Sequence, residues 1–279
     1  MTQTLSSTNL DRVTELLREV IASEVLPAFR HLLPEDVVSK PSEDDPEDVV
    51  SRVDRAAEAW LGPELTKLLP GSAVVGEEAV HAEPRLIDAL DSDGSVWVID
   101  PIDGTRNFVR GETGFGVMVA LVVQRKTRAA WIALPVADEL FVAEAGAGTT
   151  LNGARIRIPA PSEDARPAGT LYTRYVPEPA RSALEVLTGR DYEPVLGAGS
   201  AAVEYTDVVR GRKQFVVYHR LFPWDHLPGA LMVEEAGGSV RLASGATFRT
   251  SDRHGPLIAA ADAALGERVR GWIVGAGAA

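Results

Sequence analysis

Two aspartates three residues apart, Asp100 and Asp103, lie in the segment of this chain best suited to chemistry. The four apolar residues Val96–Ile99 precede them, and a proline and a glycine flank the turn, which predicts a buried strand that ends there. Carboxylates so close together repel one another unless a cation lies between them. Because oxygen ligands suit a hard ion, the pair predicts a Mg²⁺ site, with the amides of Gly104 and Thr105 facing an anion.

Each acidic candidate also has a purely structural interpretation. An aspartate-rich turn can use its side chains to satisfy its own backbone. Asp225 comes just before a helical pattern and could be its N-cap, as Asp54 could be for an earlier helix. Glu77 and Glu78 could be an exposed acidic pair at the tip of a short strand.

The glycine-rich segment Gly197–Ala202 follows a strand pattern and opens a helical pattern. It is close to the dinucleotide-binding fingerprint. The acidic residue expected about 20 positions further on is absent, since the next strand ends in Tyr218 and His219. The milder interpretation is that free amides at the start of a helix offer a place for anionic or hydroxyl groups.

The overall composition narrows the class of protein. A chain of 279 residues with 45% hydrophobic residues can bury a large core, and a net charge of −12 without a basic run argues against nucleic acid or an anionic membrane as partner. There is no cysteine, so thiolate chemistry is excluded. Asp11, Arg12 and Glu15 stand where a signal peptide needs apolar residues, and the longest apolar run, Val117–Val123, is too short to span a bilayer. We expect a cytoplasmic protein.

Helical spacing of apolar residues predicts a helix over residues 9–33, which Pro27 should kink or shorten. Residues 39–48 are polar, acidic and interrupted by proline, which predicts a mobile loop. A second helix, residues 54–69, should bend or break at Pro63. Apolar or alternating runs predict strands at 72–75, 96–99, 115–123, 129–134, 139–143 and 155–158.

The proline-rich segment 159–167 predicts a connection between an α+β half, about 1–160, and an α/β half, about 165–279, of a single domain. In the second half, strands and helices alternate, which favours stacked layers of helix, sheet, helix, sheet and helix. The predicted strands are 169–173, 193–196, 214–218 and 257–260, and the predicted helices are 179–188, 200–210, 224–236 and 263–274.

Three separated motifs together resemble the inositol monophosphatase family of Mg²⁺-dependent, lithium-sensitive phosphomonoesterases. They are Gly76-Glu77-Glu78, Trp97–Phe108 and Trp224–Gly238, in the order of the family, and the resemblance extends over about residues 10–275. It implies the layered αβαβα sandwich of the inositol monophosphatase and fructose-1,6-bisphosphatase type. It also implies a small phosphorylated metabolite as substrate and a homodimer as the assembly.

Carried over residue by residue, the resemblance implies two to three Mg²⁺ ions in one site. Glu77, Asp100 and the carbonyl of Ile102 would hold the first ion. Asp100, Asp103 and Asp225 would hold the second, and Glu77 with water molecules would hold a weaker third. Two ions can activate a water molecule and stabilise the leaving oxygen, which is what hydrolysis of a phosphate ester needs.

The resemblance also implies roles for residues around the metals. Thr105 and Glu77 would orient the attacking water, and Asp54 would support that threonine. Lys40 matches a loop lysine that closes over the metal site, although this chain has three extra residues between it and Asp54. The amides of Gly104 and Thr105 would cradle the phosphate.

One position departs from the family pattern. Inositol phosphatases carry a glutamate seven residues before the aspartate of the second metal, and Tyr218 stands there in this chain. A tyrosine cannot offer a carboxylate to a diol. Arg220 could meet a second anionic group or be an ordinary surface arginine. The predicted substrate-binding residues are Asp103, Gly104, Thr105, Gly199, Ser200, Ala201, Tyr218, Arg220 and Asp225.

The predicted function is therefore Mg²⁺-dependent hydrolysis of a small phosphate monoester, with inositol monophosphate as the first candidate. Histidinol phosphate, a sugar bisphosphate and 3′-phosphoadenosine 5′-phosphate are alternatives within the same chemistry. Two alternatives come from other classes: a non-catalytic regulator that binds phosphorylated ligands, and a dinucleotide-dependent oxidoreductase.

Overall fold

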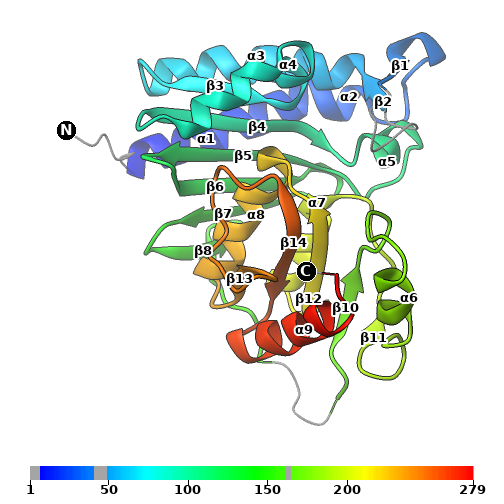
Figure 1. The fold of residues 1–279 in the computed structure, drawn as a ribbon. Coiled ribbons are helices and arrows are strands. Elements are labelled where there is room, and N and C mark those ends of the chain that lie inside the picture. The colour runs from blue at the N-terminus through cyan, green and yellow to red at the C-terminus, as the bar shows by residue number, and fades with distance from the viewer. Residues whose placement is uncertain (1–6, 41–48, 161–164, 279) are drawn as a thin grey trace.

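The computed structural model describes residues 7–40, 49–160 and 165–278, and they form five layers: helices, a sheet, helices, a second sheet and helices (Figure 1). The seven-stranded sheet takes its strands from residues 73–156, and the five-stranded sheet takes its strands from residues 168–260. The predicted αβαβα sandwich is confirmed. The division into two halves near residue 160 stays a prediction, although the two sheets lie on either side of that point in the sequence.

The seven-stranded sheet has the strand order β3-β4-β5-β6-β7-β8-β9, in which only the β3–β4 pair is parallel. Its central strands are apolar on both faces because helices cover both of them. Trp97 and Trp131 point into the core beneath the N-terminal helices, while Met118 and Ile132 point into the core shared with the second sheet. The strands are β3 (Ala73–Gly76), β4 (Ser95–Asp103), β5 (Gly116–Val123), β6 (Lys126–Leu134), β7 (Glu139–Glu144), β8 (Gly148–Leu151) and β9 (Ala154–Ile156).

The N-terminal helices cover the outer face of this sheet (Figure 1). The single helix predicted over residues 9–33 is wrong in part: α1 (Ser7–Val20) gives way to a π-helical turn, Ile21–Val25, and then to α2 (Leu26–Ala28). Pro27 explains the break, because it has no N–H to continue the bonding of the helix. In contrast, α3 (Arg52–Leu68) continues through Pro63 without ending.

Short elements near the N-terminal half were only partly predicted. The helix α3 is preceded by a short strand, β2 (Val49–Ser51), which pairs with an unpredicted β1 (Val37–Ser39). Most of the predicted mobile loop, residues 41–48, lies outside the described residues. The interpretation of Glu77 and Glu78 as an exposed pair at the tip of a strand is wrong, because they form the first turn of α4 (Glu77–Ala82). A 3₁₀ helix, Pro84–Asp91, follows.

The five-stranded sheet has the order β11-β10-β12-β14-β13, with β14 antiparallel to both of its neighbours. The helices α7 and α8 lie between the two sheets, and α6 and α9 lie on the outer side (Figure 1). No helix in the described part of the chain is long and apolar enough to cross a membrane. The elements are β10 (Ala168–Leu171), α6 (Ala180–Glu185), β11 (Glu193–Pro194), α7 (Ala201–Val209), β12 (Phe215–Arg220), α8 (Pro223–Glu235), β13 (Ser239–Leu242), β14 (His254–Ala260) and α9 (Ala263–Gly275).

Candidate active site

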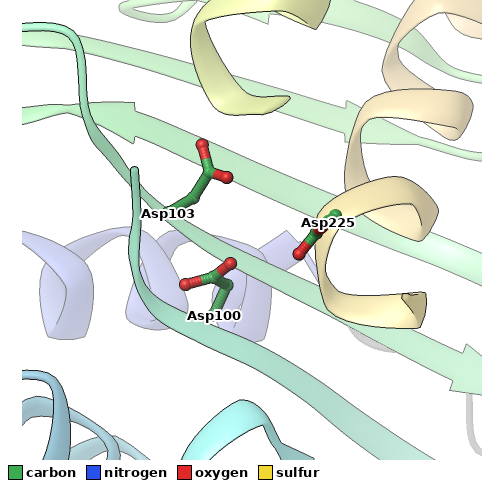
Figure 2. Close-up of side chains that lie close together, drawn as sticks. All are labelled: Asp100, Asp103 and Asp225. Atoms are coloured by element: carbon green, nitrogen blue, oxygen red, sulfur yellow. The ribbon is translucent and has the colours of Figure 1, made fainter. Parts of the chain in front are cut away.

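Three aspartates from two distant segments of the chain lie together at the C-terminal end of strand β4. Asp100 and Asp103 come from β4, and Asp225 comes from the first turn of α8 (Figure 2). One carboxylate oxygen of each residue lies within 4.8 Å of the others. A cluster of oxygen donors with like charge fits a hard divalent cation such as Mg²⁺.

The end of β4 brings its two aspartates into the interior. The prediction that the strand ends before Asp100 is wrong, since β4 runs on to Asp103 with a shift in its pairing to β5 between the two aspartates. Pro101, which has no N–H for the ladder, lies within this irregular stretch. Gly104 then ends the strand at φ +85°, and a Cβ atom there would lie 3.0 Å from the carbonyl oxygen of Gly114.

Asp100 is the most deeply buried aspartate of the three. Its residue surface is 1% exposed, and its Oδ1 has no hydrogen-bond partner among the described residues. Burial, together with the nearby carboxylates of Glu77, Asp103 and Asp225, raises its pKa well above the usual value. An unsatisfied buried oxygen is costly. Its position among other carboxylates fits a ligand shared by divalent cations.

Asp103 makes an additional contact that the sequence did not predict. Its carboxylate accepts the hydroxyl of Ser200 and the backbone N–H groups of Ala201 and Ala202, at 3.0 and 2.7 Å. The prediction that the amides of Gly197–Ala202 are free for a ligand is therefore wrong for Ala201 and Ala202, and also for Ala198, whose N–H donates to Glu204. The contact of Asp103 argues against the dinucleotide alternative, because a protein carboxylate occupies the place of the pyrophosphate.

Asp225 is the third residue of α8, so its interpretation as N-cap is wrong: Phe222 holds that position, and Pro223 starts the helix. The next residue, His226, fixes this turn to the neighbouring strand. Its Nε2 lies 2.9 Å from the carbonyl oxygen of Arg220, and its Nδ1 lies 3.0 Å from the hydroxyl of Tyr205. Since a carbonyl can only accept, Nε2 carries the proton and Nδ1 accepts from the tyrosine.

Thr105 and Asp54 form a hydrogen-bonded pair behind the cluster. The Oγ1 of Thr105 lies 2.9 Å from Asp54 Oδ1 and 2.9 Å from the carbonyl oxygen of Ile102. The other oxygen of Asp54 accepts from the backbone N–H and the hydroxyl of Ser51, the N-cap of α3. Burial raises the pKa of Asp54 to about 6. Asp54 therefore completes the capping box of its helix and holds Thr105 at the same time.

Glu77 lines the same cavity, but its carboxylate is not among the three closest. The Nζ of Lys40 lies 2.9 Å from Glu77 Oε1 and 2.7 Å from Glu78 Oε1. Although burial alone would lower it, these two carboxylates raise the pKa of Lys40 above its usual value. Burial raises the pKa of Glu77 to about 8 despite the lysine.

Glu58 supports this corner of the site and was missed at the level of sequence. It accepts the backbone N–H groups of Glu78 and Ala79, at 2.9 and 2.8 Å, and so satisfies the start of α4. A Cβ atom on Gly76 would lie 2.2 Å from the Glu58 carboxyl carbon, so only glycine fits there. The position of Glu58 one turn after Asp54 on α3 was the sequence signal that could have revealed its role.

The predicted residues line two adjoining cavities. The first, of about 290 Å³, contains the three aspartates, and Asp54 and Lys40 lie behind it in contact with its lining. The predicted residues lining it are Glu77, Asp100, Ile102, Asp103, Gly104, Thr105, Gly199, Arg220 and Asp225. Those lining the second, of about 270 Å³, are Asp103, Gly199, Ser200, Ala201, Tyr218, Arg220 and Asp225.

Comparison with known proteins agrees with the motifs. Residues 9–271 match the sequence profile of the inositol monophosphatase family. A relative from Thermotoga maritima named fructose-1,6-bisphosphatase/inositol-1-monophosphatase is 32% identical over 200 residues, which cover 71% of this chain and 73% of the relative. The protein named Nus factor SuhB from Pseudomonas aeruginosa is 34% identical over 221 residues, 76% of this chain and 78% of that protein.

Solved structures extend the likeness to almost the whole chain. The structure of an inositol monophosphatase from Thermotoga maritima superposes with a TM-score of 0.78 at 26% identity, covering 96% of this chain and 98% of that one. That of the extragenic suppressor protein SuhB from Bartonella henselae gives 0.76 at 26% identity, with the same coverage. On the profile match and these relatives, the chain belongs to the inositol monophosphatase family.

Proposed function

We propose that this protein is a Mg²⁺-dependent phosphomonoesterase that hydrolyses a small phosphorylated metabolite, with inositol monophosphate as the first candidate. The observation that carries the proposal is the aspartate cluster next to the Thr105–Asp54 pair, in which a buried oxygen of Asp100 has no partner among the described residues. The phosphatase names of several family members support it. Tyr218, at the position of the family's glutamate, keeps other phosphate esters open as substrates.

The proposed metal ligands come from both sides of the cluster. Glu77, Asp100 and the carbonyl of Ile102 would hold one ion. Asp100, Asp103 and Asp225 would hold a second, and Glu77 with water a weaker third. When bound, such ions neutralise the phosphoryl oxygens and make a coordinated water more acidic.

The side chains around the cluster orient the reactants. The hydroxyl of Thr105 donates to Asp54, so its oxygen keeps lone pairs that can accept a hydrogen from the attacking water together with Glu77. The water oxygen forms a bond to phosphorus while the bond to the alcohol oxygen breaks; one proton of the water ends on the alcohol and the other stays on the released phosphate. The amides of Gly104 and Thr105 cradle the phosphate. Lys40 holds Glu77 at the edge of the cavity.

Released phosphate measures the proposed activity directly. The purified protein is incubated with inositol 1-phosphate, histidinol phosphate, fructose 1,6-bisphosphate and 3′-phosphoadenosine 5′-phosphate, with Mg²⁺, with EDTA and with added Li⁺. We expect at least one ester to be hydrolysed with Mg²⁺, the activity to disappear with EDTA, and Li⁺ to inhibit it. No hydrolysis of any ester with Mg²⁺ would contradict the proposal.

A non-catalytic role is the second candidate, and the relatives named Nus factor SuhB favour it. The Thr105–Asp54 pair argues for turnover, because a protein that only binds a ligand has no need to orient a water molecule. Binding of a phosphate ester without hydrolysis would favour the regulator. The absence of nucleic acid partners is also a proposal, which rests on the net charge of −12.

The assembly and the location of the protein belong to the same proposal. The family resemblance supports a homodimer, and light scattering on the purified protein gives the mass that tests it. A cytoplasmic location fits the composition, and fractionation of cells that express the full chain tests that location.

A further inference from the structure

The second cavity lies on the side of the aspartate cluster where the alcohol part of a substrate would extend. It shares Asp103, Gly199, Arg220 and Asp225 with the first cavity, so the two form one continuous site. Its remaining lining comes mainly from aromatic and basic residues after β10 and at the end of β12, where the pairing shifts between Tyr218 and Arg220.

Arg220 lines both cavities. Within the part of the chain that the structure describes, no carboxylate lies at ion-pair distance from its guanidinium. The guanidinium carbon instead lies 4.5 Å from the ring centroid of Phe222 and 5.3 Å from that of Tyr175. Rings that pack over a guanidinium leave the N–H groups at its edge as the donors for a ligand. Arg220 therefore offers a fork of donors to both cavities.

Tyr218 adds an independent sign of a ligand. The residue is 9% exposed and lines the cavity, yet its hydroxyl has no hydrogen-bond partner among the described residues. Its ring is held by stacking on Tyr172 and Tyr205, with centroids 5.5 and 5.4 Å away. Buried hydroxyls are normally paired. A rigid donor and a cation that both lack a partner among the described residues fit a polar ligand group.

The backbone of Arg220 is also fixed in place. The Nε2 of His226 donates to the carbonyl oxygen of Arg220, 2.9 Å away. The base of the arginine is thus held by α8, while its guanidinium lies against Phe222 and Tyr175. A donor positioned before a ligand arrives loses less entropy on binding.

We infer that this cavity is a subsite for a second anionic group on the alcohol part of the substrate, which Arg220 binds through its guanidinium edge with the hydroxyl of Tyr218 nearby. The preferred esters would then be bisphosphates or phosphorylated hydroxy acids. Guanidinium forks match phosphate and carboxylate equally well, so the shared chemistry is an oxyanion. The inference rests on the proposed phosphatase function, and it explains how a chain with a net charge of −12 could prefer a more highly charged substrate.

Matched pairs of esters test this inference. Glucose 1-phosphate and glucose 1,6-bisphosphate differ by a phosphate, and glycerol 2-phosphate and 2-phosphoglycerate differ by a carboxylate. In at least one pair, we expect the wild-type protein with Mg²⁺ to have a kcat/KM about tenfold or more higher for the doubly charged ester, the ratio that one charged hydrogen bond provides. The pair that shows the preference identifies the anion.

Three variants assign that preference to the arginine. Arg220→Gln should remove it, and Arg220→Lys should keep part of it because the charge remains. Arg268→Gln is the matched control, since Arg268 is an exposed arginine of α9 that lies over Trp272, and it should keep the whole preference. No preference in either pair, or a preference that Arg220→Gln leaves unchanged, would overturn the inference.

A binding measurement separates this inference from the proposed function. If no ester is hydrolysed, the phosphatase proposal fails, and calorimetry with the same four esters and Mg²⁺ then tests the subsite alone. Tighter binding of a doubly charged ester that is lost in Arg220→Gln would support the subsite. Equal binding within both pairs would overturn it.

Discussion

The two cavities that meet at Asp103 and Asp225 are built in different ways. In the first cavity, which we call the phosphate side, the aspartates come from the end of β4 and the first turn of α8. The neighbouring Asp54 is held by the capping box of α3. In the second cavity, which we call the leaving-group side, Glu204 accepts the hydroxyl of Tyr172 and forms a buried ion pair with Lys213, 2.6 Å away.

We relate this difference to function: the phosphate side would carry out hydrolysis, and the leaving-group side would select the substrate. The phosphate side contains the residues that we propose bind the metal ions and orient the attacking water. The leaving-group side has an aromatic stack and a cation where the resemblance implied a carboxylate at Tyr218. The first side would therefore be retained by any phosphatase with this fold, and the second is where we expect this chain to select its own substrate.

The largest expected effect is on the phosphate side. Asp100→Asn should lower Mg²⁺-dependent phosphate release by about a thousandfold or more, as for other groups that stabilise a charged transition state. In EDTA its thermal midpoint should equal or exceed that of the wild type, because one of several repelling carboxylates is gone.

The matched control for this substitution is Asp138→Asn. Asp138 is exposed at φ +52°, a backbone conformation that asparagine also adopts, so activity and stability should both stay as in the wild type. Wild-type activity in Asp100→Asn would mean that the aspartate cluster is not the catalytic centre.

On the leaving-group side, Glu204→Gln should weaken the fold most. Glu204 is 0% exposed and accepts from Lys213, from the hydroxyl of Tyr172 and from the backbone N–H of Ala198. A buried lysine without its carboxylate should lower the free energy of unfolding by about 3–5 kcal/mol, measured by urea denaturation.

Glu267→Gln provides the comparison for that measurement. Glu267 pairs with Arg270 on the surface of α9, and its side chain is 61% exposed. We expect a loss of less than about 1 kcal/mol there. Equal losses in the two glutamine variants would show that the buried pair does not hold the leaving-group side together.

The hydroxyl of Thr105 is the next test of the phosphate side. Thr105→Val keeps the shape of the side chain but removes the group that donates to Asp54, and should lower kcat by about a hundredfold if it orients the water. Thr105→Ser retains the hydroxyl and should retain most of the rate. If the serine variant loses as much as the valine variant, the methyl group matters rather than the hydroxyl.

The smallest expected effect distinguishes two neighbouring aspartates. Asp103 accepts from the first turn of α7, whereas Asp100 Oδ1 has no partner among the described residues. Asp103→Asn should therefore lower the free energy of unfolding in EDTA by about 1 kcal/mol, since a negative charge at a helix N-terminus is lost. A gain in stability would show that repulsion within the cluster outweighs the helix contact.

The two cavities also differ in how well the sequence predicts them. The pairing of Asp100 with Asp103 could be expected from their spacing, whereas the proximity of Asp225 was implied by the family resemblance. The αβαβα layers followed from apolar runs and from strand–helix alternation. The prediction failed where Pro27 turned the first helix into a π-helical turn, and where β4 continued past its proline.

The leaving-group side could not be predicted in the same way. Glu204 and Lys213 are charged residues of ordinary appearance in the sequence, and nothing local distinguishes a buried ion pair from two exposed charges. The sequence left open whether Arg220 binds an anionic group or is an ordinary surface arginine. Only tertiary packing places Tyr175 and Phe222 beside its guanidinium.

The central claim is that Asp100, Asp103 and Asp225 together bind a divalent cation. Crystals of the full chain soaked in Mn²⁺, which takes the same oxygen ligands as Mg²⁺, would test it through anomalous scattering. We predict an anomalous peak between these three carboxylates in the wild type that is absent in Asp100→Asn. A wild-type crystal with Mn²⁺ bound elsewhere and no peak at the cluster would contradict the account.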